Sequence, residues 1–265
     1  MITPVILIAI SLGAAFLAGM SPKGSARLPF LIVLAALTAV TAASAHMVYQ
    51  FVTGHATAVI QSTAGFQAPF SIALKAGFEE SAAILLINLT GLLGLPYVYR
   101  MIMDNGKHSA ITYLLYFMAL NGIVMTHDIF NYFVFIEISS IAVAGMLMFG
   151  RSKELLKAGF SWLVATGIIA IFLILGAVLF YVETGVLDID TVFASSGHIK
   201  AGSAAAFFLF LALVLELKPF PANGWAVDVY GSAPAGISAA ISGAGLTAGL
   251  FALYKILPEI GRAHV

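Results

Sequence analysis

The sequence predicts an all-α, polytopic membrane helix bundle, and three observations support this class. Hydrophobic residues make up 61% of the 265 residues and charged residues only 9%, whereas soluble chains are about 45–50% apolar and about 25% charged. Several apolar runs reach the ~20 residues that a spanning helix needs. These runs lack the period-two alternation of an outer-membrane barrel, and helices satisfy every backbone amide internally within hydrocarbon.

About eight apolar runs are expected to form transmembrane helices in a single membrane domain, residues 1–265. The first run has no basic region before it, which predicts a membrane helix rather than a cleaved signal peptide. The loop of residues 53–79 is the longest and is expected to hold an interfacial segment. The expected spans, in chain order, are 3–20, 28–52, 80–102, 110–126, 128–150, 158–182, 203–218 and 233–257.

The basic residues predict an N-terminus outside the cytoplasm, because cytoplasmic loops carry an excess of Lys and Arg. Both termini then lie outside, where Arg262 is a mild exception, and the acidic loop that follows the sixth span also lies outside. The inside loops would hold Lys23, Arg27, Arg100, Lys107, Arg151, Lys153 and Lys157, and the outside loops Lys75 and Lys200.

One carboxylate lies in the middle of the fifth span, "HDIFNYFVFIEISSIAVAGMLMFG" (127–150). A charge at this depth costs at least ~2.5–3.5 kcal/mol, so Glu137 is a functional hypothesis by default. Ser140 and Ala144 share its helix face and allow close helix approach, so Glu137 is expected to point into the bundle. It could load and release a proton; the structural alternative is a fixed ion pair between helices.

The seventh span ends in "LVLELKPFPANGWAVDVYG" (213–231) and is expected to break. Pro219 and Pro221 remove amide donors, and transporters use broken helices at their ion sites. Glu216 and Lys218 would point to roughly opposite sides of a regular helix. The alternative is that Pro219 simply ends the helix and Lys218 extends to the interface.

Four further ionisable residues are candidates for proton transfer, each with a structural alternative. Lys157 opens the sixth span, where it could also be an ordinary inside anchor. Lys255 lies near the outer end of the eighth span, where an interfacial anchor is the simpler role. His127 and Asp128 lie between the fourth and fifth spans, where they suit proton entry or exit, or a capping turn in which Asp accepts backbone amides.

The remaining residues predict no cofactor, no metal site and no nucleic-acid partner. The formal net charge is zero and cysteine is absent, which excludes a basic field, disulfides and thiolate ligation. No phosphate-binding glycine loop or Ser/His/Asp arrangement occurs. The stretch 237–249 is a small-residue surface expected to face another helix. The scattered histidines show no ligand spacing; they are His46, His55, His108, His198 and His264.

Several segments resemble the antiporter-like membrane subunits of respiratory complex I, Mrp-type cation/proton antiporters and membrane-bound hydrogenases. "HDIFNYFVFIEISSIA" (127–142) is similar to their fifth-helix signature, and "GFQAPFSI" (65–72) to the loop before their third helix. "LKAGFSWL" (156–163) resembles the entry to their sixth helix. "PANGWAVDVYGSAPAGISAAISG" (221–243) resembles their passage from helix seven to helix eight, so the matches run in order over most of the chain.

The resemblance implies a bundle of inverted five-helix repeats that moves protons, sometimes in exchange for sodium. Residues 1–109 would hold the first three helices and residues 110–257 the first repeat. Glu137 would be the helix-five glutamate that pairs with a lysine, and Lys157 the lysine that opens helix six. The expected setting is the inner membrane of a prokaryote, where the bilayer and other membrane subunits are the partners. One of those subunits could supply the second repeat.

Two positions depart from the family pattern. The helix-seven lysine falls on Glu216, with Lys218 two residues later, so the usual pair is either shifted to Glu137–Lys218 or replaced. The helix-eight lysine falls on Thr247, and Lys255 lies beyond it. The preferred interpretation is a proton-translocating subunit of a complex I-like or hydrogenase-type oxidoreductase, itself without a redox cofactor. A subunit of a sodium/proton antiporter and a non-conducting scaffold are the alternatives.

Overall fold

A computed structural model describes residues 3–22, 24–55, 57–62, 71–150, 152–195 and 202–262. Several residues used in the sequence predictions lie outside the described residues. These are Lys23, residues 65–70 of the third-helix loop, Arg151, His198, Lys200 and His264.

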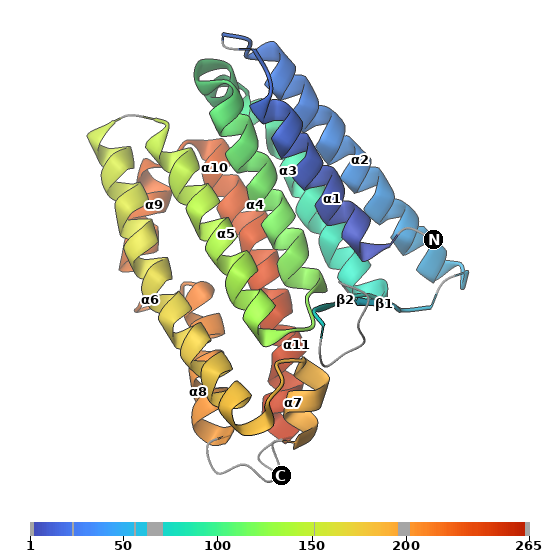
Figure 1. Cartoon of the computed structure of the whole chain (residues 1–265). Coiled ribbons are helices and arrows are strands. Elements are labelled where there is room, and N and C mark those ends of the chain that lie inside the picture. The colour runs from blue at the N-terminus through green and yellow to red at the C-terminus, as the bar shows by residue number, and fades with distance from the viewer. Residues whose placement is uncertain are drawn as a thin grey trace.

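The described chain is a bundle of long helices that run side by side (Figure 1). Every expected span coincides with a helix to within a few residues. The last of them is a composite of α10 (Ala235–Ala239), a π-helical turn η3 (Ala240–Gly245) and α11 (Leu246–Arg262). The other long helices are α1 (Pro4–Gly19), α2 (Arg27–Val52), α3 (Phe78–Asn105), α4 (Lys107–Met125), α5 (Ile129–Met148), α6 (Lys153–Thr184) and α8 (Gly202–Glu216).

Six of these helices are long and apolar enough to cross a membrane, and two more are apolar but shorter. The six are α2 to α6 and the composite last helix; α1 and residues 204–216 of α8 are the shorter ones. The predicted class, a multi-pass helical membrane protein, is therefore confirmed. Two short helices were not expected from the sequence: α7 (Ile189–Ser195) and α9 (Gly224–Ser232).

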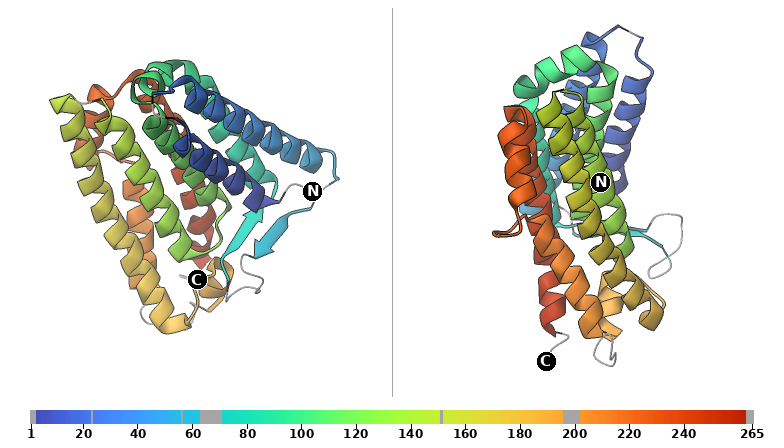
Figure 2. Two further views of the ribbon diagram at one scale, coloured as in Figure 1. Left: turned by 45° about the horizontal axis from the view of Figure 1, so that its top comes forward. Right: turned by 90° about the vertical axis from the view of Figure 1, so that its left-hand side faces the viewer.

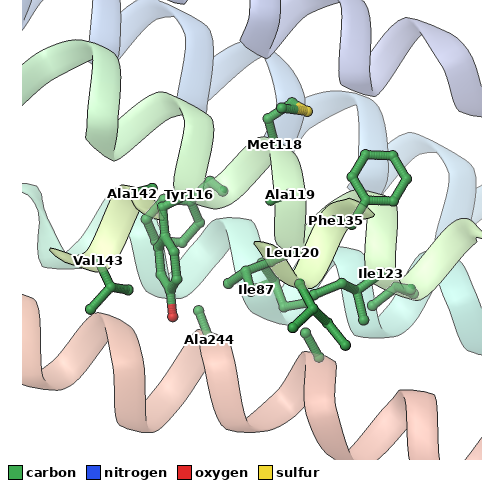
Figure 3. Close-up of a cluster of buried hydrophobic side chains, with 14 of the residues drawn as sticks. Ile87, Tyr116, Met118, Ala119, Leu120, Ile123, Phe135, Ala142, Val143 and Ala244 are labelled. Carbon is green, nitrogen blue, oxygen red and sulfur yellow. The ribbon is translucent and has the colours of Figure 1, made fainter. Parts of the chain in front are cut away.

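Helix α4 lies at the centre of the bundle and is buried along most of its length. It packs against α1, α3, α5 and α11, while α6 packs against α5, α8 and α9. Figure 2 shows α1 and α2 on one flank and α6 and α8 on the other. The core around α4 is apolar and aromatic: Tyr116, Leu120 and Ile123 of α4 meet Phe135 of α5 and Ala244 of the last helix (Figure 3).

The small-residue stretch in the last helix packs against α3 and α4, as the sequence predicted. A Cβ atom on Gly236 would lie 2.7 Å from a side-chain atom of Val98, and a Cβ atom on Gly245 would clash with the Tyr116 hydroxyl. Glycine therefore allows the helix backbones to approach where a larger residue would hold them apart.

The loop between α2 and α3, where the sequence predicted an interfacial segment, holds two antiparallel strands that form a hairpin. Strand β1 (Val59–Ser62) pairs with β2 (Ala73–Ala76), with Val59 opposite Ala76. The Ala73 carbonyl accepts a hydrogen bond from the His127 amide at 2.9 Å. The hairpin was missed because it is short and its β2 strand is fixed by this tertiary contact with the turn between α4 and α5, which no local pattern reveals.

Candidate functional site

The predicted helix break lies at the end of α8, at Glu216. Lys218 has a backbone φ of 58°, the left-handed region that residues with a side chain rarely adopt. Pro219 and Pro221 cannot donate a backbone hydrogen bond, so the chain does not resume a helix until Gly224. A left-handed residue followed by two prolines therefore ends the helix; the Lys218 side chain is largely buried, whereas Phe220 and Pro221 are exposed.

The left-handed turn brings the Lys218 side chain back onto Glu216. Lys218 Nζ donates to the Glu216 carbonyl oxygen at 2.7 Å and lies 3.7 Å from Glu216 Oε1. Both side chains are largely buried. On a regular helix the two side chains would point to opposite sides; they meet because the helix breaks here, as predicted, and residue 218 has left the helical region.

Two indole rings complete the surroundings of the ammonium. Lys218 Nζ lies 5.2 Å from the ring centre of Trp162 on α6 and 5.8 Å from that of Trp225 on α9. The rings meet edge to face, with centroids 5.2 Å apart. Aromatic faces at this distance stabilise a cation. We call Trp162, Glu216, Lys218 and Trp225 the helix-break cluster.

A small cavity of about 20 Å³ opens beside this cluster. Its volume suits about one water molecule, which needs ~10–15 Å³ and polar partners. The cavity lies among α4, α5, α6, α8 and the last helix. Its polar lining consists of Tyr116, Ser139, Trp162, Glu216 and Lys218. The arrangement places a carboxylate, an ammonium and a hydroxyl around a space that can hold water.

Glu137 lies on α5 one residue from Ile136 and two from Ser139, both of which line the cavity. It is half-buried rather than enclosed. Among the described residues no ion pair includes it, and the charged group that acts on it is Glu216. The structure therefore pairs Lys218 with Glu216 and leaves Glu137 as a second acidic group nearby.

A second group of ionisable residues lies where α11 meets the turn between α4 and α5. Lys255 Nζ donates to the carbonyl oxygens of Val124 and Thr126 at 3.1 and 3.0 Å. It also lies 3.8 Å from Glu80 Oε1 on α3. His127 Nε2 lies 2.9 Å from Asp190 Oδ2 on α7. We call Glu80, His127, Asp190 and Lys255 the α7-end cluster.

Asp128 caps α5, because its carboxylate accepts a hydrogen bond from the Asn131 amide at 2.8 Å. Burial raises the pKa of Asp128 above its usual value, and the neighbouring Asp188 acts in the same direction; two backbone amides partly offset this rise in pKa. The capping role expected as an alternative is therefore present in the structure.

Lys157 lies apart from both clusters. Its side chain is exposed on α6 and lines a surface groove of about 150 Å³ together with Glu154 and Asp228. Thr247, at the position of the family's second lysine, uses its hydroxyl to hydrogen-bond the Gly243 carbonyl of its own helix at 2.8 Å. Neither residue reaches the cavity beside Lys218 in the described part of the chain.

Several residues of these clusters were missed from the sequence. Trp162 and Trp225 are the only tryptophans in the chain, and Glu80 is a carboxylate at the start of a long apolar helix. Both features are visible in the sequence and could have marked these residues as candidates. Asn88 and Asn121 were also missed. They exchange two buried hydrogen bonds of 2.9 and 3.1 Å between α3 and α4, and amides this deep in apolar spans are expected to pair.

The fold and site together define a class: a multi-pass helical membrane protein whose broken helix places buried charges beside a cavity. A family model described as NADH:quinone oxidoreductase/Mrp antiporter, TM, matches residues 126–263. The chain belongs to this family. The resemblance inferred from the sequence motifs is thereby confirmed.

Relatives from both branches of that description are similar to the chain. A Na(+)/H(+) antiporter subunit of Alkalihalophilus pseudofirmus is 27% identical over 196 residues, 72% of this chain and 40% of the relative. An NADH-quinone oxidoreductase subunit of Desulforudis audaxviator is 29% identical over 201 residues, 73% of this chain and 40% of the relative. The chain therefore spans about 40% of the length of the curated relatives it matches.

Two solved membrane complexes contain chains of the same fold. A chain of the membrane-bound sulfane sulfur reductase, an archaeal respiratory complex, superposes with a TM-score of 0.87 at 25% identity, over 97% of this chain and 53% of that one. A chain of the Mrp complex from Dietzia sp. superposes with a TM-score of 0.84 at 21% identity, over 96% of this chain and 47% of that one.

Proposed function

We propose that this chain translocates protons across the membrane as an antiporter-like subunit of a larger assembly. The observation that carries the proposal is the Glu216–Lys218 pair, which lies at a helix break beside a cavity of water size. Irregular backbone at membrane depth is tolerated where it is buried in protein or lines a wet cavity. Transporters place their ion sites at such breaks.

Glu137, Glu216 and Lys218 are the groups that would hold the proton. Lys218 neutralises one carboxylate of the nearby acidic pair Glu137 and Glu216. A water in the cavity would connect the groups. The chemistry is proton transfer alone, so any redox step belongs to other subunits.

The relatives support two kinds of assembly, and we favour a respiratory oxidoreductase. One solved structure of the same fold at 25% identity is a chain of an archaeal respiratory membrane complex. The second candidate is a sodium/proton antiporter, which the name of the Alkalihalophilus relative supports. Both kinds consist of several membrane subunits, so other membrane subunits are the partners of this chain.

The test is proton translocation per turnover by the complex purified through a tag on this chain and reconstituted in vesicles. Glu137→Gln, Glu216→Gln and Lys218→Met should each reduce coupled translocation about 100-fold or more, the low end of the contribution of a positioned acid–base group. Glu183→Gln is the matched control, because Glu183 is an exposed carboxylate at the end of α6. Unchanged coupled translocation in all three site variants would refute the proposal.

Two further readouts separate the alternatives. Sodium-driven alkalinisation of vesicles without a redox substrate would favour the antiporter over the oxidoreductase. If the double variant Glu137→Gln with Lys218→Met leaves transport intact while the complex fails to assemble, the chain is a scaffold.

A further inference from the structure

One face of the last helix leads from the cavity beside Lys218 toward the α7-end cluster. Gly245, Gly249 and Ala252 line the cavity, and their spacing of four and three residues places them on one helix face. Lys255 follows three residues later on the same face, about 4.5 Å further along the helix axis. Figure 1 shows that this part of α11 runs to the end of the bundle where α7 lies.

Lys255 is held by groups that favour a cation. The two carbonyl oxygens that accept its hydrogen bonds belong to Val124 and Thr126, at the C-terminal end of α4. Carbonyls at a helix C-terminus carry partial negative charge. Only 10% of the Lys255 side chain and 8% of the Glu80 side chain are exposed. A lysine that only anchored the helix at the interface would keep its ammonium in water, so this environment does not fit the anchor role.

Glu80 has a defined second contact, because its Oε2 accepts a hydrogen bond from the Gly77 amide at 2.8 Å. Its other oxygen, Oε1, is the atom that faces Lys255. The pair is therefore a buried acid and a buried base on separate helices, α3 and α11. Such a pair can exist as two ions or as two neutral groups, and the difference between the two states is the position of one proton.

His127 and Asp190 form a second pair beside this buried pair, and Asp190 is in contact with solvent. His127 follows directly after Thr126, whose carbonyl binds Lys255. Its side chain is 7% exposed, whereas that of Asp190, 2.9 Å away, is 70% exposed. An imidazole can accept a proton on one ring nitrogen and release one from the other. The cluster thus contains both largely buried groups and a solvent-exposed carboxylate.

Other charged groups around Lys255 are engaged elsewhere or lie on neighbouring elements. Glu79 accepts a hydrogen bond from the Tyr254 hydroxyl at 3.2 Å. Asp188 accepts hydrogen bonds from Thr191 at the start of α7, and Asp128 caps α5. Lys75 on β2 adds a positive charge that acts on Lys255. No acidic group other than Glu80 lies within 4 Å of Lys255 Nζ in the described ranges.

We propose that the α7-end cluster is a proton-transfer site between the cavity and the aqueous face at the α7 end of the bundle. A proton leaves the Lys255 ammonium for a water, passes to one His127 nitrogen while the other nitrogen releases a proton to Asp190, and then enters bulk water. The Glu80 carboxylate compensates the positive charge of Lys255 while Lys255 is protonated. The reverse direction uses the same groups. The proposal rests on the proposed proton-translocating function.

The experiment uses the same reconstituted complex and measures proton flux with a pH-sensitive dye. His127→Ala should lower the flux about 100-fold or more, the low end of the contribution of a positioned proton-transfer group. Free imidazole should restore it when added on one side of the membrane only, because the variant leaves a space of that shape near the surface. Lys255→Met should lower the flux without rescue by imidazole. Glu79→Gln is the matched control for Glu80→Gln.

Normal flux in His127→Ala, or reduced flux that imidazole does not restore from either side, would overturn the proposal, because a structural histidine gives no such rescue. If His127→Ala does not assemble, Asp190→Asn replaces it. Asp190 is exposed, so this variant should fold, and its reduced flux should recover as the buffer concentration rises; flux equal to that of the parent would overturn the proposal. If Glu137→Gln, Glu216→Gln and Lys218→Met all keep normal flux while imidazole still rescues His127→Ala, the proposed role of the Glu216–Lys218 site is refuted. The proposed role of the α7-end cluster is then still supported.

Discussion

Replacement of Lys218 by glycine, alanine and methionine should separate the backbone strain at the helix break from the charge that the break holds. A side-chain-bearing residue in the left-handed region costs about 1–2 kcal/mol, and Lys218 has a φ of 58°. Glycine adopts this region freely but loses about 0.5–1 kcal/mol more conformational entropy on folding than alanine. Lys218→Gly should therefore be more stable than Lys218→Ala by roughly 0.5–1 kcal/mol.

All three variants remove the ammonium and should be less stable than the parent. Loss of one partner of a buried ion pair costs about 3–5 kcal/mol when the other charge stays buried, and the Glu216 side chain is still 16% exposed, which lowers this cost. We expect Lys218→Met to lose about 2 kcal/mol or more at neutral pH on this basis. The double variant Glu216→Gln with Lys218→Met should recover much of the loss, because no unpaired charge remains.

Denaturant unfolding in mild detergent, followed by tryptophan fluorescence, measures these differences. The chain has two tryptophans, and both rings lie over Lys218, so the signal comes from the site itself. Equal stability of the glycine and alanine variants would show that residue 218 is not held in the left-handed region. A Lys218→Met variant as stable as the parent would show that the ammonium does not pair with Glu216.

Three further variants test the packing and capping of the bundle. Asn88→Ala should cost about 1–3 kcal/mol by leaving the Asn121 amide buried without a partner, and in a denaturant titration the double replacement by leucine should cost less than the two single replacements together. Asp128→Ala should lose about 1 kcal/mol of cap energy, while Asp128→Asn keeps the cap. Because the pKa of Asp128 is raised in the fold, the parent loses stability as pH rises through the window above 3.8. Unfolding measured at several pH values should therefore show the stability of the Asn variant rising relative to that of the parent. Gly176→Ala should destabilise the α6–α8 pair by about 1–3 kcal/mol, because the new Cβ would lie 3.0 Å from the Leu209 amide nitrogen. The control is Gly167→Ala on the same helix, whose Cβ would meet nothing within 4 Å and which should be neutral or stabilising in thermal unfolding. Equal effects of the two replacements would contradict the close contact at Gly176.

The membrane architecture could be predicted because length and hydropathy act locally along the chain. Each of the eight expected runs became a helix, since hydrocarbon leaves the backbone no alternative to internal pairing. The β1–β2 hairpin escaped prediction because β2 is held by a contact between Ala73 and His127, which lie far apart along the chain. The π-helical turn at 240–245 also escaped, because it depends on how glycines fit against α3 and α4.

The candidate site was only partly predictable. Glu137, Glu216, Lys218, Lys255 and His127 could be selected one by one, because an ionisable group within an apolar span is costly and therefore noticeable. Which of them meet could not be read from the sequence. Lys218 was expected either to pair with Glu137 or to extend to the interface, and Lys255 was expected to be an interfacial anchor.

The sequence by itself determined that this is a multi-pass helical membrane protein of the antiporter-like family, where the seventh helix breaks, and which charges lie within or beside its apolar runs. Only the tertiary structure decided their partners. A single left-handed residue turns Lys218 back onto Glu216 and between two indoles. The approach of α11 to the end of α4 places Lys255 beside Glu80. The physical reason is that burial cost is a property of one residue and its depth, whereas pairing depends on backbone geometry and on helices far apart in the chain.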